Sequence, residues 1–121
     1  MVSIPSNSIN NTSHIKEGVE FLTVINMLQP PEDRQQETVN LLKAGITEKI
    51  RHIPGFISAN IHRSLDSNHI IVYAQWESEA HLQEAVKLIE TGEAPEMLEV
   101  FSFANPEYHP YQVEAVLRPI A

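Results

Sequence analysis

The stretch FISANIHRSLDSNHIIVYAQW, residues 56–76, decides the fold of this chain. Its first part, FISANIHRS (56–64), alternates apolar with polar residues, and its last part, HIIVYAQW (69–76), is rich in β-branched and aromatic residues. The residues between them, LDSN (65–68), are typical of a turn. Two such runs joined by a short polar turn predict an antiparallel β-hairpin.

The residues before this hairpin predict a strand and a helix. The segment FLTVINML (21–28) is apolar on both faces, as expected for a central strand that is covered on two sides. Pro30-Pro31 ends that strand and opens a helix within residues 31–53, and Pro54-Gly55 ends the helix. The helix is marked by one apolar stripe at three- and four-residue spacing, formed by Val39, Leu42, Ile46, Ile50 and Ile53.

The residues after the hairpin predict a second helix and a last strand. Ser78 can cap a helix that runs to about Thr91. We expect residues 94–103 to form a short helix or a packed loop, NPEYHP (105–110) to be turn-like, and YQVEAVLRP (111–119) to be the last strand. The resulting order, β-α-β-β-α-β, predicts an α+β fold of the ferredoxin-like class with an antiparallel sheet.

The composition fits one folded domain with a polar arm. We expect residues 1–18, rich in Ser and Asn, to be a flexible arm, and residues 19–121 to form the ferredoxin-like domain. The chain starts without the basic and apolar segments of a signal peptide, and no apolar run approaches the roughly 20 residues of a membrane span. Because the chain has no cysteine, disulfides and thiolate metal sites are excluded, and we expect a cytoplasmic protein.

The net charge argues against nucleic acid as a partner, and the spacing of the histidines argues against a metal site. A formal net charge of −8, from 8 basic and 16 acidic side chains, repels phosphate backbones, so we do not expect nucleic acid as a partner. The histidines show no metal-ligand spacing, so we predict no metal site.

Strand alternation also predicts a homodimer. Two helices cover only one face of a four-stranded sheet. Placing Leu22, Phe56 and Ile70 toward the helices leaves many large apolar side chains on the other face, namely Phe21, Ile25, Met27, Ile57, Ile61, Ile71 and Tyr73. A patch of that size favours a second copy packed sheet against sheet. The alternative is that the faces are assigned wrongly and the patch is smaller.

Two strings carry a family resemblance. His52-Ile53-Pro54-Gly55-Phe56, with Ser58-Ala59 and His62 after it, and Tyr73-Ala74-Gln75-Trp76-Glu77-Ser78 are similar to the antibiotic biosynthesis monooxygenase family over roughly residues 20–90. The resemblance implies a dimeric α+β barrel with a pocket between sheet and helices in each subunit. Members include cofactor-free oxygenases of aromatic polyketides, quinol oxygenases and haem-degrading enzymes, and many have no known activity. No bound cofactor is therefore expected.

Position by position, the resemblance is selective. The polyketide oxygenases line the pocket with the Trp of the second string, and Trp76 matches it. Where they use an Asn and a Tyr, this chain has Val72 and Leu82, and an Arg of theirs aligns with Glu96.

The haem-degrading branch is disfavoured by the same comparison. Its first-strand Asn is matched by Asn26. Its catalytic Trp and haem-binding His align with Ala85 and Pro95.

Strand alternation places five polar or aromatic side chains toward the helices, namely Asn26, Ser58, Asn60, His62 and Trp76. Cofactor-free oxygenation of a phenol or hydroquinone needs a base, donors for the resulting anion and apolar walls that exclude water. We therefore predict His62 as the base, Asn26 and Asn60 as donors, and Trp76 as a stacking group. The remaining predicted substrate contacts are Ser58, Phe56, Val72, Leu82 and Val24.

Each of these roles has an alternative. His62 can be structural or exposed, Trp76 can be a packing residue, and Asn26 can bond backbone at a bulge. The sequence thus predicts a small monooxygenase that acts on an electron-rich aromatic, polyketide or quinol substrate. The alternative function is a non-catalytic dimeric module that binds an apolar small molecule.

Overall fold

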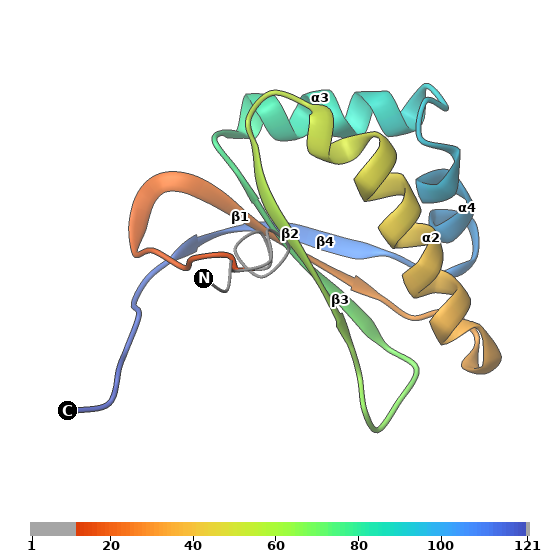
Figure 1. The fold of residues 1–121 in the computed structure, drawn as a ribbon, viewed down its shortest axis with the longest axis horizontal. Helices are drawn as coiled ribbons and strands as arrows, with labels where there is room; N and C mark the ends of the chain where they lie inside the picture. Colours follow the sequence, from red (N-terminus) through yellow and green to blue (C-terminus); the bar gives the residue numbers. More distant parts are fainter. Residues whose placement is uncertain (1–11, 121) are drawn as a thin grey trace, which may run out of the picture.

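A computed structural model describes residues 12–120 and shows a four-stranded sheet with three helices on one face (Figure 1). The strands are β1 (Gly18–Leu28), β2 (Phe56–Arg63), β3 (Ile70–Trp76) and β4 (Glu107–Val113). The helices are α2 (Gln35–Glu48), α3 (Glu79–Glu90) and α4 (Pro95–Phe103), with single 3₁₀ turns η1 (Glu32–Arg34) and η2 (Ile50–His52). The strand order is β2-β3-β1-β4 and every pairing is antiparallel. The predicted ferredoxin-like α+β fold is confirmed.

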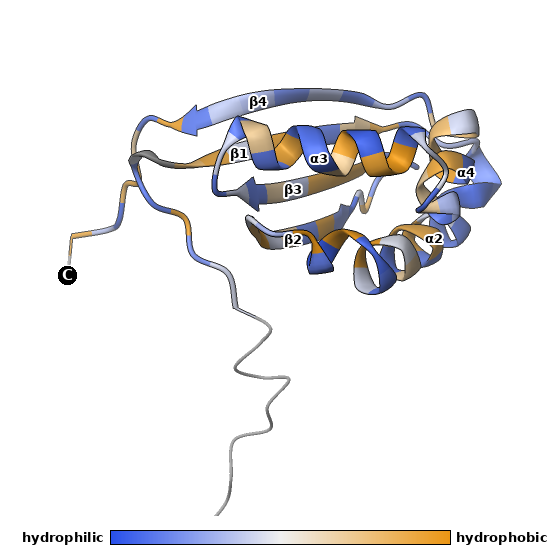
Figure 2. Ribbon diagram, turned by 90° about the horizontal axis from the view of Figure 1, so that it is seen from above, coloured by the Kyte–Doolittle hydropathy of each residue, from blue (hydrophilic) through white to orange (hydrophobic). Residues whose placement is uncertain are grey.

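The core lies between the sheet and the helices. Leu28 and Ile70 from the sheet and Leu42 and Val100 from the helices are completely buried. Figure 2 shows apolar residues recurring along α2 and α3, whereas the edge strand β4 is mainly hydrophilic. Gly45 lets α4 approach α2, because a Cβ at this position would lie 2.8 Å from Sδ of Met97. None of the helices within residues 12–120 is long and apolar enough to cross a membrane.

Three predicted boundaries differ from the structure. The helix expected within residues 31–53 is divided into η1, α2 and η2. Of the two alternatives expected for residues 94–103, the short helix is formed, as α4. The last strand starts four residues earlier than predicted, at Glu107, and ends at Val113. Pro110 is tolerated in it because β4 is an edge strand, where a missing N–H breaks no inner ladder. The ladder ends with the pair Gly18 and Val113, since β1 starts there.

The predicted register of β2 is wrong beyond Phe56. Phe56 pairs with Trp76 but Ser58 pairs with Gln75, so Ile57 is an extra residue in a β-bulge. An inserted residue moves all following side chains to the opposite face. Ala59 and Ile61 therefore pack against the core. The side chains expected there lie on the outer face instead: Ser58, Asn60 and His62.

A polar network occupies part of the outer face. Ser58 Oγ donates a hydrogen bond to Gln75 Oε1 at 2.6 Å, and Gln75 Nε2 donates to the backbone oxygen of His14 at 2.6 Å. Ser13 Oγ donates to Asn60 Oδ1 at 2.9 Å. Gln75 is 1% exposed under this cover. Ser13 and His14 of the predicted arm thus contact the folded domain. Residues 1–11 of that arm lie outside the described residues.

Candidate active site

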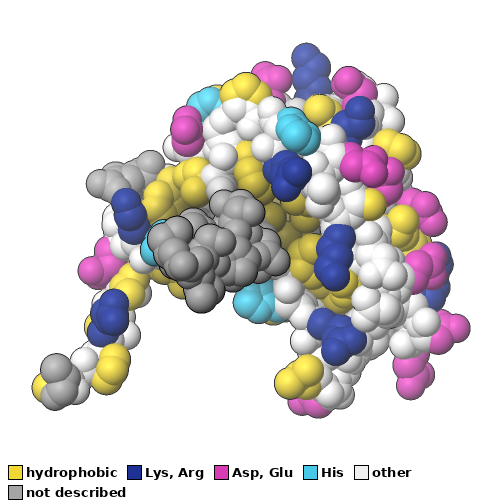
Figure 3. Space-filling view, in the orientation of Figure 1, with side chains coloured by type: hydrophobic (Ala, Val, Ile, Leu, Met, Phe, Trp, Pro, Cys, Tyr) yellow, Lys and Arg dark blue, Asp and Glu magenta, His cyan; other side chains and the backbone are white. Residues whose placement is uncertain are grey.

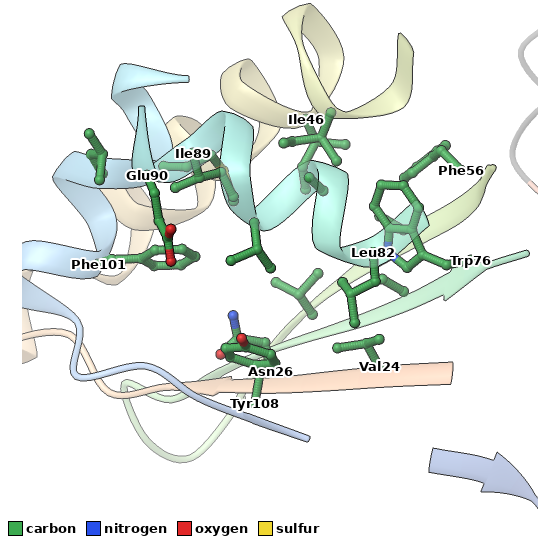
Figure 4. A pocket seen from close by; sticks show the side chains of 18 residues that line it. Val24, Asn26, Ile46, Phe56, Trp76, Leu82, Ile89, Glu90, Phe101 and Tyr108 are labelled. Carbon is green, nitrogen blue, oxygen red and sulfur yellow. The ribbon is translucent and has the colours of Figure 1, made fainter. Parts of the chain in front are cut away.

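A cavity of about 270 Å³ lies between the inner face of the sheet and the helices (Figure 4). Its volume is close to the lower end of the range of roughly 300–1,000 Å³ that is usual for small-molecule sites. Most of its lining is apolar, contributed by the strands, by α2 and η2, and by α3 and α4. The polar groups in the lining are the side chains of Asn26, Glu90 and Tyr108 and the indole N–H of Trp76.

The structure brings six of the nine predicted site residues to this cavity. They are Val24, Asn26, Phe56, Val72, Trp76 and Leu82. The other three, Ser58, Asn60 and His62, lie on the opposite face of the sheet because of the bulge at Ile57. His62 is exposed there and pairs with Ile71, so the expected position of the base in the pocket is wrong.

The sequence interpretation missed the far end of the cavity. Tyr108 was placed in a turn, but it belongs to β4 and pairs with Asn26. Glu90 lies at the end of α3, and α4 adds Met97, Leu98 and Phe101. An earlier start for the last strand would have revealed Tyr108, because its ring would then have fallen on the inner face. Among the positions where this chain differs from the functional residues of the family, Ala85 lines the cavity, whereas Glu96 is not part of its lining.

Trp76 forms a rigid wall of the cavity. It is 3% exposed, and its ring meets Phe56 edge to face with centroids 5.4 Å apart and an interplanar angle of 84°. Behind this pair, Gly55 has a φ of +88° and packs directly against the ring of His81. Ser78 caps α3 by accepting a hydrogen bond from the His81 backbone N–H, and its Oγ lies 2.7 Å from Nδ1 of His81.

The side-chain oxygen of Asn26 is an unsatisfied hydrogen-bond acceptor in mostly apolar surroundings. Its Oδ1 atom is buried and has no hydrogen-bond partner, so the alternative of a backbone bond at a bulge is not realised for this atom. Leaving such an acceptor unpaired costs about 1–3 kcal/mol. In Figure 4 the amide nitrogen of Asn26 points into the cavity, and Tyr108 lies beside it on the sheet side. This pair can bind a hydroxyl group or an oxyanion of a ligand.

The charged groups around the cavity are few. Glu90 is the charged residue in its lining, which holds no Lys, Arg or His from the described part of the chain. No group of three or more potential metal ligands occurs within residues 12–120. A displaced pKa occurs elsewhere, on the surface of α2, where a hydrogen bond from Arg34 lowers the pKa of Glu37.

Fold and cavity together define a small ferredoxin-like domain that can enclose an apolar ligand against a tryptophan and an asparagine. The sequence profile of the antibiotic biosynthesis monooxygenase family matches residues 21–94, so the chain belongs to this family.

Two relatives fit this assignment. Tetracenomycin-F1 monooxygenase of Streptomyces glaucescens is 36% identical over 66 residues, which cover 54% of this chain and 59% of that protein. The matched part thus spans less than two thirds of this relative. A monooxygenase from the gene ActVA-Orf6 of Streptomyces coelicolor, solved in complex with nanaomycin D, is 28% identical with a TM-score of 0.58 and covers 84% of this chain and 93% of that chain.

A third protein shares the fold. SnoaB of Streptomyces nogalater, a cofactor-independent oxygenase, has a TM-score of 0.70 at 17% identity, covering 83% of this chain and 99% of that chain.

Proposed function

We propose that the protein is a cofactor-independent monooxygenase that oxidises an electron-rich aromatic, polyketide-type or quinol substrate in the cavity between sheet and helices. The observation that carries the proposal is Asn26, an amide side chain with a buried and unpartnered Oδ1, in the lining of a mostly apolar cavity that also contains Trp76. The family and the monooxygenases among its relatives support it.

The overall reaction needs only substrate and O₂. For an anthrone-type ring, a CH₂ group becomes a C=O group: the carbon loses two hydrogens and gains one oxygen atom, and the second oxygen atom leaves as water. The four electrons that reduce O₂ come from the substrate. The protein's task is therefore to form and hold the electron-rich anion and to exclude bulk water.

Two residues fit these tasks. Asn26, whose amide nitrogen points into the cavity, can donate a hydrogen bond through Nδ2 to the oxyanion that forms. Trp76, nearly buried and fixed edge to face on Phe56, presents a flat wall against which an aromatic substrate can stack.

Oxygen consumption tests the proposal. We expect the purified protein, in the presence of a chelator and without added cofactor, to accelerate O₂ uptake with hydroxyanthrones or hydroquinones above the uncatalysed rate. Asn26→Leu should lower turnover about 10–10³-fold because the anion loses its donor. The matched control is Asn40→Leu, at an exposed position on α2 outside the cavity. A panel that gives no uptake above the uncatalysed rate would reject the function.

The second candidate is a non-catalytic module that binds an apolar small molecule. It is favoured by the walls at Val72 and Leu82, which are apolar and nearly buried at positions where the polyketide oxygenases have polar groups. Quenching of the single tryptophan by hydroxyanthraquinones without any O₂ uptake would support this candidate.

We also propose that the protein acts as a homodimer through the outer face of the sheet. Met27 and Ile57 are 41% and 44% exposed there. Figure 3, seen from the β2 edge of the sheet, shows hydrophobic side chains beside the strands and acidic side chains toward the periphery. Burying the exposed apolar side chains of the outer face removes apolar surface from water. Ile61 packs toward the core, and a polar network surrounds Gln75 on the outer face. The apolar area of this face is therefore smaller than predicted from the sequence.

A further inference from the structure

The cavity has one feature that Asn26 and Trp76 leave unexplained. Glu90, the last residue of α3, is the one charged residue in the lining of this mostly apolar cavity within the described part of the chain. Figure 4 shows its carboxylate beside Phe101, reaching from the helix layer toward the sheet, where Asn26 and Tyr108 lie. Glu90 makes no salt bridge with any residue in the described part of the chain.

We propose that Glu90 is the catalytic base of this site and makes it selective for uncharged phenolic substrates. The inference rests on the proposed function. The reason is chemical: the reaction needs a proton acceptor within reach of the substrate, His62 lies on the other face of the sheet, and Glu90 is the carboxylate in the cavity lining.

The proton step is simple. A carboxylate oxygen of Glu90 takes the proton of the substrate hydroxyl, which leaves a neutral carboxylic acid and a phenolate. The phenolate oxygen receives hydrogen bonds from the amide of Asn26 and the hydroxyl of Tyr108, which share a ladder position on β1 and β4. After oxygen transfer Glu90 returns this proton to the phenolate oxygen of the product, and the water that is formed from O₂ takes its two hydrogens from the CH₂ group.

The negative charge of Glu90 also determines which ligands bind well. A carboxylated substrate would bring a second negative charge into a cavity whose described lining holds no cation. Coulomb repulsion in partly solvated surroundings should weaken its binding about ten-fold relative to the uncharged analogue. An uncharged phenol has no such penalty, and its hydroxyl is the proton donor that Glu90 requires.

Glu90→Gln tests the catalytic part. The variant keeps shape and hydrogen bonding but cannot accept the proton, so turnover of a dihydroxyanthrone should fall roughly 10²–10⁴-fold. Glu84→Gln is the matched control, because it makes the same charge change at an exposed position of α3 outside this cavity and should keep the wild-type rate. Glu90→Asp should retain part of the activity, because a carboxylate remains. Thermal unfolding of all variants should match the wild type, because Glu90 is exposed.

Ligand binding tests the selective part independently of turnover. Quenching of Trp76 is titrated with a hydroxyanthraquinone and with the same ring system bearing a carboxylate. The wild type and Glu84→Gln should prefer the uncharged ligand about ten-fold, and Glu90→Gln should bind both about equally. A Glu90→Gln enzyme within about threefold of the wild-type rate would overturn the base assignment while leaving the oxygenase function intact. A wild type without catalysed O₂ uptake would instead reject the function and the base together. An unchanged preference in Glu90→Gln would overturn the selectivity.

Discussion

Replacing Gly55 with alanine tests how firmly the aromatic wall of the cavity is held. Gly55 precedes Phe56, has a φ of +88°, and accepts a hydrogen bond from the backbone N–H of Glu77 at 2.8 Å. A Cβ at this position would lie 2.1 Å from Cγ of His81, whose Nδ1 lies 2.7 Å from Oγ of the cap residue Ser78. The substitution therefore strains the backbone and displaces the first turn of α3.

Gly92 provides a control that separates these two effects. Its φ is +84°, but a Cβ there would meet no atom within 4 Å. Gly92→Ala should thus cost the backbone strain alone, about 1–2 kcal/mol. Gly55→Ala should add the cost of overpacking, typically about 1–3 kcal/mol, which brings its total to about 2–5 kcal/mol.

Thermal unfolding followed by circular dichroism measures the difference. With a shift of roughly 4 °C per kcal/mol for a domain of this size, Gly92→Ala should melt about 4–8 °C lower and Gly55→Ala about 8–20 °C lower. The fluorescence of Trp76 should change in Gly55→Ala alone, because the wall that it forms with Phe56 moves. Equal melting temperatures of the two variants would refute the packing argument.

Three further predictions follow from other parts of the structure. Ile71→Lys, on the outer face, should convert a dimer to monomers in light scattering. Leu65→Lys should not, because Leu65 lies in the hairpin turn and is 94% exposed; a dimer that persists in Ile71→Lys rejects the sheet-to-sheet interface. A chain that lacks residues 1–17 should melt about 4–8 °C lower than a chain that starts at residue 12, because Gln75 and Asn60 lose their hydrogen-bond partners His14 and Ser13. Equal melting temperatures of the two chains would show that these contacts contribute nothing to stability. Haem titration should give no stoichiometric Soret shift, since Ala85 and Pro95 replace the Trp and His of the haem-degrading branch; a shift that saturates at one haem per chain would contradict this.

Local sequence signals predicted the main elements because their causes are local. The helix α3 starts where Ser78 can cap it. Pro30 lies between β1 and the helical segment that follows, and Pro54 lies between that segment and β2. Apolar periodicity also identified much of the cavity wall, since Val24, Val72 and Leu82 follow the repeats of a strand and a helix. The family strings pointed to Trp76 for the same wall.

The position of the polar residues depended on tertiary structure. The bulge at Ile57 has no clear sequence signal, because it depends on how β2 pairs with β3, and it moved His62, Ser58 and Asn60 to the outer face. Tyr108 reached the cavity because β4 pairs along β1 from Glu107 onward, a long-range contact that composition does not reveal.

The sequence by itself thus determined the order of the elements, the apolar inner wall and the charge of the chain, all of which depend on neighbouring residues or on residue counts. The tertiary structure alone decided which polar groups share the cavity. A one-residue change in strand register reverses a whole face, and only the packed sheet sets that register. Asn26 and Tyr108 come together because of the register between β1 and β4, and the packing of α3 over the sheet adds Glu90.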